Sequence, residues 1–451
     1  VKNSAYVLGR AVTIAVRYSQ VRHQGSAMSV DLNHVQEHPV MRYPQQRKLL
    51  FPLVAYTYAV HCTGTDCWRM YARYLADPTN MGVLAELHST TSCLKATVTH
   101  AVCAGMETCR AACGGHGFLS SSGFQELMMS YLPMKTLEGT REVLLLQTGK
   151  WLVALAGQQL STFGPRPYLP PTVQYLSHLA PSLSSLLWGR RALGTPVNLS
   201  SELARLKSFE DDTTVTFAVS SGAALATTLL GAFEKRALHT IMEATTALHR
   251  TSTGLEAHID DGDSIKRGTK ASRTRARAMR EKAVSTQGVK LSEAAEAHAE
   301  LLIVRSLHQS ACGGAGLAAT LGATDRIALQ RLLLLLLMTF IEKSLGDFLA
   351  ADCFGNAIEA RRGLDALTGR LLDEMEPHAR ALVDAFSFSD QRLDSTLGRA
   401  DGRVYEGIFE ATQREPLNRK EVGEGYYRYL RDVLLKPMPD PGAPAPMRAR
   451  L

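Results

Sequence analysis

The stretch CRAACGGHGFLSSSGFQELMMSYLPMKTLEGTREVLLLQTGKWLV, residues 109–153, joins a glycine-rich turn to an isolated glutamate and then to an apolar helix. The turn at 114–117 contains three glycines and one histidine, and Glu138 follows it in the motif Leu-Glu-Gly-Thr. Each feature alone has a structural explanation, because glycines permit tight turns and a carboxylate is favoured near a helix N-terminus. Together they predict helices around a turn and single out Glu138 for a chemical explanation.

Apolar residues recur with helical spacing along most of the chain. The segment 4–24 places its apolar residues at the i, i+3, i+4, i+7 positions of one helix face. Further helices are predicted at 45–75, 83–106, 141–159, 201–248, 290–312, 323–351 and 356–387. Alternating strand patterns and hairpin turn signals are scarce. We therefore expect an all-α fold of two helical bundles in series.

Proline-rich stretches interrupt the helical pattern once in the middle of the chain and again at its end. The stretch STFGPRPYLPPTV, 161–173, cannot continue a helix. We therefore expect four parts: a first bundle at 1–160, a connection at 161–199, a second bundle at 200–436, and a flexible Pro-rich tail at 437–451.

Composition indicates an ordinary globular protein. Of 451 residues, 45% are apolar and 21% are charged, and the formal charge is +7. This modest excess of positive charge fits an anionic ligand or a phosphate-bearing cofactor and does not indicate nucleic acid. The basic run at 266–282 is either a solvated helix face or an anion-binding surface. No apolar run reaches the length of a membrane span.

Cysteine usage and the C-terminus indicate a compartment. The eight cysteines include no CxxC pair, so we expect free thiols in a reducing intracellular compartment and no metal site. The terminal tripeptide Ala449-Arg450-Leu451 is a variant of the Ser-Lys-Leu address. We therefore expect a peroxisomal location, with an import receptor reading this tripeptide.

The glycine turn and the glutamate motif together resemble the signature of the acyl-CoA oxidases, members of the acyl-CoA dehydrogenase superfamily. The resemblance continues, in the family's order, through segments 13–24, 48–59, 291–304, 382–410 and 416–430. It thus covers nearly the whole chain. It implies the C-terminal helical part of a peroxisomal acyl-CoA oxidase. Such an enzyme oxidises fatty acyl-CoA to trans-2-enoyl-CoA with FAD and reduces O2 to H2O2, the first step of peroxisomal β-oxidation.

The resemblance makes Glu138 the base that removes the α-proton of the thioester while a β-hydride passes to the flavin. That proton is far less acidic than a carboxylic acid, so the enolate needs hydrogen bonds from a flavin hydroxyl and from the backbone N–H of Glu138. An apolar niche would also raise the proton affinity of the base. We therefore expect Leu137 and Leu144–Leu146 to form dry walls around Glu138, beside the glycine turn.

The resemblance also implies cofactor contacts. Gly114 and Gly115 match paired glycines whose backbone lies close to the FAD of a partner subunit, where only residues without Cβ permit the approach. Arg22 matches an arginine that meets the FAD diphosphate across a homodimer interface, a contact suited to guanidinium. Thr140 matches a threonine that contacts the adenosine part of FAD in the dehydrogenases. His116 is a weaker candidate, with a turn residue as its alternative.

The chain departs from the family pattern at several points. The oxidase motif Glu-Gly-Glu-Asn is Glu138-Gly139-Thr140-Arg141 here, and Pro44 replaces a family glutamine. The family's N-terminal helical domain and middle β-domain have no counterpart in the sequence, so the isolated chain is expected to be inactive. Two alternatives stay open: an acyl-CoA dehydrogenase that passes electrons to another flavoprotein, and a truncated, non-catalytic protein that dimerises.

Overall fold

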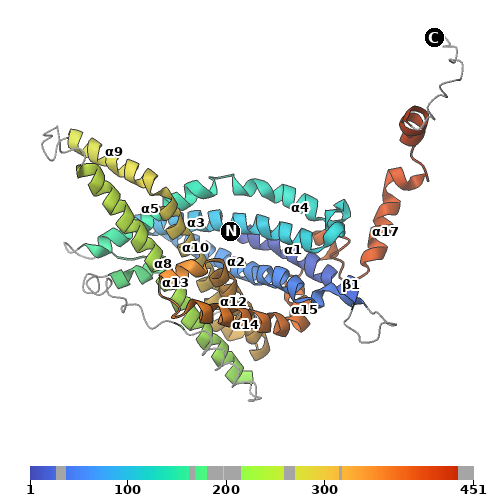
Figure 1. Ribbon diagram of the computed structural model, residues 1–451, viewed down its shortest axis with the longest axis horizontal. Coiled ribbons are helices and arrows are strands. Elements are labelled where there is room, and N and C mark those ends of the chain that lie inside the picture. The colour runs from blue at the N-terminus through green and yellow to red at the C-terminus, as the bar shows by residue number, and fades with distance from the viewer. Residues whose placement is uncertain are drawn as a thin grey trace, which may run out of the picture.

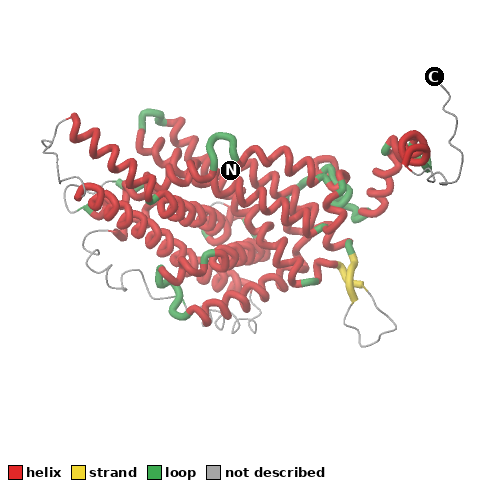
Figure 2. Tube along the Cα trace, turned by 45° about the horizontal axis from the view of Figure 1, so that its top comes forward, coloured by secondary structure: helices red, strands yellow, loops and turns green. Residues whose placement is uncertain are grey.

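The computed structural model describes residues 1–26, 37–161, 168–179, 197, 215–257, 270–313 and 317–434. Within these ranges the regular structure is almost entirely helical (Figures 1 and 2). The sheet that they contain is one short antiparallel pair, β1 (His23–Ser26) with β2 (Glu37–Pro39). The predicted all-α fold is confirmed. The predicted tail at 437–451 and its terminal tripeptide lie outside the described residues.

The first bundle is formed by four long helices, α1 (Lys2–Val21), α2 (Pro44–Ala76), α3 (Met81–Ala112) and α5 (Arg141–Leu160). Short helical segments connect α3 to α5, namely η2 (Gly114–Phe118), η3 (Ser120–Ser122), α4 (Phe124–Tyr131) and η4 (Leu132–Lys135). A single 3-10 turn, η1 (Val40–Arg42), precedes α2. Pro44 opens α2, where its missing N–H costs nothing. The side chain of Asn80 caps α3 by accepting from the N–H of Val83 at 3.2 Å.

Helix α1 lies inside the first bundle. Its buried residues fall on most sides of the helix, including Leu8, Val12, Ile14 and Val16. A helix that is apolar on most sides has to be covered on most sides, and α1 accordingly packs against both α2 and α3. The bundle therefore holds α1 rigidly along its length, which fixes the position of its C-terminal end at Arg22.

The second half of the chain adds four long helices, α8 (Val215–Ala257), α10 (Gly288–Cys312), α12 (Ala323–Lys343) and α14 (Ala357–Met375). The remaining elements up to residue 393 are α9 (Lys270–Thr286), α11 (Leu317–Thr320), α13 (Leu345–Ala350), η6 (Glu376–His378), α15 (Ala379–Asp384) and α16 (Asp390–Leu393). The leucine run at 332–337 in α12 is buried throughout. A buried helix, rather than a membrane span, therefore accounts for this run.

The two halves share one continuous hydrophobic core. Helix α10 packs against α2, α3 and α5 of the first half as well as against α8 and α12 of its own half. Inside this core Arg236 of α8 and Glu300 of α10 form an ion pair at 2.5 Å, and each is almost fully buried. Buried charges persist only when they are paired, so this contact fixes how α8 and α10 meet.

The predicted connection at 161–199 contains structure that packs into the core. Helix η5 (Pro171–Leu179) buries Val173 and Leu176 completely. Tyr175 is also buried, and its hydroxyl hydrogen-bonds Nδ1 of His298 in α10 at 2.9 Å. Helix η5 therefore packs against both halves of the molecule, touching α5 of the first half and α8 of the second.

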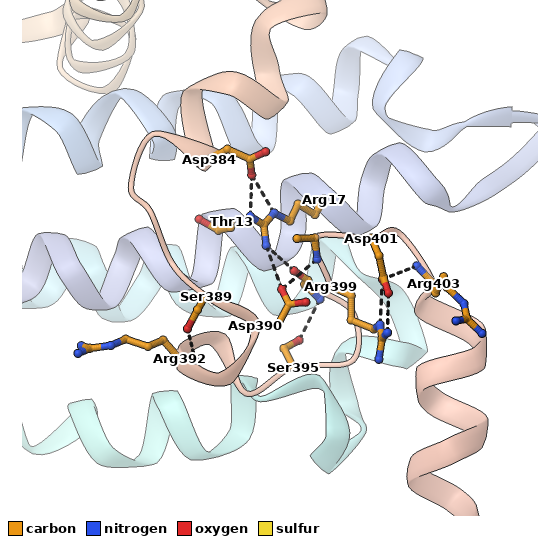
Figure 3. A network of polar contacts seen from close by, with 12 residues as sticks. Thr13, Arg17, Asp384, Ser389, Asp390, Arg392, Ser395, Arg399, Asp401 and Arg403 are labelled. Carbon is orange, nitrogen blue, oxygen red and sulfur yellow. Dashed lines mark hydrogen bonds and ion pairs between the residues drawn. The ribbon is translucent and has the colours of Figure 1, made fainter.

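The chain returns from the second bundle to α1 through a polar network (Figure 3). Arg17, which is almost fully buried, pairs with Asp384 at 2.7 Å and donates to the carbonyl of Gly398 at 2.7 Å. Arg399 and Asp401 form a further pair at 2.5 Å. The contacts of Arg17 bind residues 384 and 398 to α1, the Arg399–Asp401 pair braces the segment that follows, and α17 (Val404–Arg414) begins shortly after it.

Beyond this anchor the chain leaves the body of the molecule. Figure 1 shows α17 and the following segment extending away at the end that carries β1. The later elements are η7 (Pro416–Arg419) and the π-helix η8 (Tyr426–Leu434). Only the first turn of α17 is buried, at Val404 and Gly407. The anchor thus places the start of α17, including Tyr405, beside the end of α1.

Candidate functional site

The first candidate pocket lies at the C-terminal end of α1 and has a volume of about 670 Å³. We call it the Arg22 pocket. It brings together Arg22, Gly114, Gly115 and His116, which the sequence singled out. Its other lining residues include Tyr18, Gln24, Tyr43, Gln45, Gln46 and Ala112. Three separate parts of the sequence, the ends of α1 and α3 and the start of α2, therefore meet around one cavity.

Arg22 is held by a contact from the far end of the chain. Its Nη1 atom donates to the hydroxyl of Tyr405 at 3.3 Å, and this bond raises the pKa of the guanidinium. Among the described residues no carboxylate lies within ion-pair distance of Arg22. The guanidinium is half-buried and keeps donors available for an anion.

Three further polar side chains of the pocket have fixed positions. Tyr18 and His116 share a hydrogen bond between the hydroxyl and Nδ1 at 2.9 Å, and burial raises the pKa of Tyr18 to about 12. Gln46 donates to the hydroxyl of Ser19 and to the carbonyl of Ala112, both at 2.9 Å. The wall of the pocket is therefore organised by contacts within the chain.

The two glycines of the turn differ in what they require. Gly114 has a φ of +61°, a left-handed conformation that favours glycine. A Cβ added at Gly115 would meet no atom of the chain within 4 Å. Internal packing therefore gives no reason for a glycine at 115, although its backbone lines the pocket. A ligand that approaches this backbone closely would supply the reason.

The second candidate pocket contains Glu138 and has a volume of about 530 Å³. We call it the Glu138 pocket. Its lining residues are Val1, Lys2, Gly64, Cys67, Trp68, Tyr71, Leu87, Thr91, Ser92, Lys95, Glu138 and Leu144. The loop that carries Glu138 lies between η4 and α5, on the surface of the bundle.

The backbone at Glu138 has an unusual conformation. Its φ is +60°, and Gly139 follows with a φ of +109°. A left-handed conformation is costly for a residue with a Cβ and is most often seen where function requires it. Neither the backbone N–H nor the carboxylate of Glu138 makes a hydrogen bond or ion pair with a described residue. Both groups are therefore free to bind a ligand.

Two cations hold the Glu138 loop. The Nζ atom of Lys95, in α3, donates to the carbonyl of Gly139 at 2.6 Å and to that of Lys135 at 3.4 Å. Arg141, the first residue of α5, pairs with Glu296 of α10 at 2.6 Å. The loop is thus tied both to the first bundle and to the second.

The two pockets lie towards opposite ends of the same three helices. On α1 the Glu138 pocket takes Lys2 and the Arg22 pocket takes Tyr18. On α3 the corresponding residues are Lys95 and Ala112. With a rise of about 1.5 Å per residue, these spacings place the pockets roughly 25 Å apart. The two pockets share no lining residue.

The expectation that Glu138 lies in a dry niche beside the glycine turn is therefore wrong. Glu138 is exposed, Leu137 is 50% exposed, and only Leu144 of the predicted leucine walls lines the pocket. The reason is that α4 and η4 carry the chain back along α3 after the turn. Residues 114 and 138, which are moderately close in sequence, consequently lie in different pockets. The role of Glu138 as a base stays a prediction.

The remaining sequence candidates have clear positions. Thr140 is exposed at the N-terminus of α5, makes no capping hydrogen bond there, and lines neither pocket. No group of three His, Cys, Asp or Glu side chains within the described ranges could hold a metal ion. None of the helices described combines the length and apolarity that a membrane span requires. All eight cysteines are free thiols.

Sequence reasoning missed Tyr405 and Lys95. Tyr405 lies in a family-like segment, but no local pattern connects it to Arg22, which is 383 positions away in the chain. Lys95 did offer a signal. It is the only Asp, Glu, Lys or Arg between Glu86 and Glu107 of α3, and a lone charge in such a stretch needs a polar partner.

Comparison with known families matches two parts of the chain. Residues 1–153 match the family described as "Acyl-CoA oxidase, C-alpha1 domain", and residues 263–435 match that described as "Acyl-CoA oxidase". Together these matches cover well over half of the chain, including all the lining residues of both pockets.

Individual relatives extend the match to nearly the whole chain. The rat peroxisomal acyl-coenzyme A oxidase 1 is 30% identical over 438 residues, covering 97% of this chain and 57% of the relative. The structure of Arabidopsis thaliana acyl-CoA oxidase 1 is similar with a TM-score of 0.72 and 28% identity, covering 96% of this chain and 56% of that one. Acyl-CoA oxidase-1 of Caenorhabditis elegans, complexed with FAD and ATP, has a TM-score of 0.72 and 26% identity, with coverages of 96% and 55%. The chain spans little more than half the length of these relatives.

Proposed function

The chain belongs to the acyl-CoA oxidase family, and we propose that it forms the helical part of an FAD-dependent oxidase of fatty acyl-CoA. The reaction converts acyl-CoA to trans-2-enoyl-CoA and O2 to H2O2. The observation that carries the proposal is the pair of separate pockets, one with an anion-binding arginine and glycine backbone, the other with an unpartnered carboxylate. The first pocket offers groups that could bind the cofactor, and the second offers a base for the substrate.

The Arg22 pocket fits the diphosphate part of FAD. Arg22 has donors to spare, and a guanidinium binds phosphate oxygens in a bidentate manner. The backbone at Gly114 and Gly115 leaves space that a Cβ at 115 would occupy. Tyr405 accepts a hydrogen bond from the guanidinium, and Gln46 bonds the neighbouring wall through the carbonyl of Ala112.

Glu138 is the proposed base. Its carboxylate takes the proton from the α-carbon of the thioester, and its backbone N–H donates to the thioester carbonyl as negative charge develops there. Both groups are without partners among the described residues, and Glu138, whose backbone is left-handed, lines the pocket. The chemistry that FAD supplies when bound is acceptance of the β-hydride and reduction of O2.

The distance between the pockets supports a homodimer. Roughly 25 Å along the helices separates Glu138 from Arg22, so we assign the two residues to two different FAD molecules. Glu138 acts beside the cofactor of its own chain, and Arg22 with Gly114 and Gly115 contacts that of the partner subunit. Thr140 is assigned to the adenosine part of FAD on the resemblance alone.

The rim of the Glu138 pocket supports a larger assembly. Two exposed aromatic side chains line it: Trp68 is 65% exposed and Tyr71 is 40% exposed. Single exposed apolar residues are ordinary, but a cluster beside a pocket marks an interface. We propose that the part of the family which this chain does not span covers the rim, excludes water from Glu138 and completes the acyl-CoA site.

A peroxisomal location follows from the relatives, which are named peroxisomal acyl-coenzyme A oxidases. The tripeptide Ala449-Arg450-Leu451 is the proposed ligand of an import receptor. A fluorescent protein fused to the N-terminus should enter peroxisomes with this tripeptide and stay in the cytosol without it. Identical distributions would refute the assignment.

The function is tested on the full-length gene product purified with FAD. Addition of a fatty acyl-CoA under air should yield trans-2-enoyl-CoA and H2O2 in equal amounts. Flavin that is reduced by substrate without forming peroxide would indicate a dehydrogenase instead. If neither this product nor the 451-residue chain binds FAD, the protein is a non-catalytic member of the family.

A further inference from the structure

Lys95 is the strongest functional feature that the proposed reaction does not yet use. It lies in the middle of α3 between buried residues, and its own side chain is only partly exposed. Burial lowers the pKa of its ammonium group, and the nearby charge of Glu138 acts in the opposite direction. Placing an ammonium here is costly, so its contacts have to be accounted for.

The contacts of Lys95 hold the two ends of the loop that contains Glu138. The Nζ atom donates to the carbonyl of Gly139 at 2.6 Å on one side of Glu138 and approaches the carbonyl of Lys135 at 3.4 Å on the other. Hydrogen bonds from a charged donor are shorter and stronger than neutral ones. One side chain therefore fixes both ends of the segment that bears the proposed base.

The same loop stores backbone strain. Glu138 and Gly139 both have positive φ, and a Cβ at Gly139 would lie 3.0 Å from the side chain of Leu144. Strained conformations persist only where surrounding contacts over-determine them. Lys95 supplies the polar part of that constraint from α3, and Leu144 supplies the packing from α5.

We propose that Lys95 is a positioning residue for Glu138, holding the loop 135–139 in its strained conformation and setting the electrostatic potential at the carboxylate. The proposal deepens the proposed function and rests on it for the identity of the base. Lys95 makes no ion pair with Glu138 in the structure, so its charge acts on the carboxylate from beyond direct contact.

Other charged and titratable groups also face the Glu138 pocket. They are Lys2, Cys67, Tyr71 and Lys95. Lys2 comes from α1, and Cys67 and Tyr71 come from α2. Lys95 is the member of this set that bonds directly to the loop, so its removal changes both geometry and charge.

The first test measures the loop without any catalysis. A glutamyl endopeptidase cleaves after Glu138 only when the loop opens, and cleavage under native conditions follows local opening. In the 451-residue chain, Lys95→Met should be cleaved about 10- to 100-fold faster at this bond, as expected for loss of one charged hydrogen bond. Lys95→Arg should be cleaved at the parental rate, and so should Lys150→Met, which removes an exposed lysine of α5.

Equal cleavage of Lys95→Met and the parent would overturn the positioning role, whatever the protein catalyses. Circular dichroism identifies a Lys95→Met variant that does not fold, and Lys95→Gln, which keeps a donor of similar length, then takes its place. For Lys95→Gln the expected cleavage rate lies between those of the parent and a freely opening loop. A rate identical to that of the parent would again contradict the proposal.

The second test uses the pH dependence of kcat/KM in the full-length protein. Removing a nearby positive charge makes a carboxylate bind its proton more readily. The acid limb should therefore move to higher pH in Lys95→Gln and return to the parental position in Lys95→Arg. If kcat/KM of Lys95→Gln fell but the acid limb of its pH profile stayed in place, Lys95 would have only a structural role. That result would refute the proposed effect of its charge on Glu138. Absence of activity in the parent would count against the proposed function, whereas the proteolysis result would still decide the loop contact.

Discussion

The Arg22 pocket and the Glu138 pocket lie on the same helices, but they differ in how many of their polar groups already have hydrogen-bond partners within the chain. At the Arg22 pocket, Tyr405, Tyr18, His116 and Gln46 already hold one another or the backbone in place. At the Glu138 pocket the carboxylate and the backbone N–H have no partner among the described residues, and the rim is apolar and exposed. The difference teaches that the chain organises the Arg22 pocket by its own contacts, whereas the polar groups of Glu138 are left for other residues or a ligand to bind. The proposed function assigns the cofactor to the first pocket and the reaction to the second.

The largest expected effect separates chemistry from cofactor binding. Glu138→Gln keeps the size of the side chain and removes the base, so turnover of the full-length protein should fall by about 10²- to 10⁴-fold or more. FAD affinity should not change, because the Arg22 pocket is untouched. The measurements are peroxide production and flavin absorbance of the purified protein. Retained turnover would remove Glu138 from the mechanism.

The next effect is expected at the opposite pocket. Arg22→Ala removes the phosphate-binding guanidinium, and FAD affinity should fall about 10- to 100-fold, as for the loss of a charged hydrogen bond. Flavin fluorescence titration measures it. Arg392→Ala is the matched control. Arg392 also donates to a tyrosine hydroxyl, that of Tyr6 at 2.8 Å, but it lies outside both pockets. Equal losses in both variants would contradict a specific site.

A smaller effect tests the anchor that brings Tyr405 to Arg22. Asp384→Asn removes the charge that faces the almost fully buried Arg17 (Figure 3). Because Asp384 is itself about one-third exposed, the free energy of unfolding should fall by only about 1–3 kcal/mol. Urea denaturation measures this change. Asp365→Asn, at an exposed pair with Arg361 on α14, should change it by less than about 0.5 kcal/mol.

The smallest effect concerns Tyr405 itself. Tyr405→Phe removes a single hydroxyl from Arg22 and leaves the ring in place. One hydrogen bond of this kind contributes about 0.5–1.5 kcal/mol, so FAD affinity should fall about 2- to 10-fold while Glu138-dependent chemistry is unaffected. Tyr429→Phe, on exposed η8, serves as the control. A loss of turnover without loss of affinity would show that the two pockets are coupled.

The sequence predicted the helices because their buried faces follow a simple period. Helices α1, α2, α5 and α10 begin and end close to their predicted bounds, and the glycine turn and the glutamate loop fall between α-helices as expected. The predictions 323–351 and 356–387 were too long, because α12 ends at Lys343 and α14 at Met375, where the short elements α13, η6 and α15 follow. The prediction 201–248 corresponds to α8, which spans Val215–Ala257. The resemblance gave Arg22, Gly114 and Gly115 the same ligand, and the three residues line one pocket. Their contact with that ligand stays a prediction. Local pattern and family motif were sufficient for these features.

The placement of Glu138 could not be read from the sequence in the same way. Its distance from the turn depends on α4 and η4 running back along α3, which is a matter of tertiary packing. The contacts of Tyr405 with Arg22 and of Arg141 with Glu296 join residues far apart in the chain. The left-handed backbone of Glu138 lies in a loop that Lys95 contacts from α3, at the carbonyls of Lys135 and Gly139. No local preference predicts any of these.

The central claim is that Glu138 and Arg22 of one chain serve two different cofactor molecules. Subunit mixing tests it most directly: full-length Glu138→Gln and Arg22→Ala proteins are co-expressed and assayed at an FAD concentration too low for Arg22→Ala alone. A mixed dimer contains one site with both residues intact, so random pairing should restore about one quarter of the parental activity. Activity no greater than the sum of the two separate variants would contradict the account.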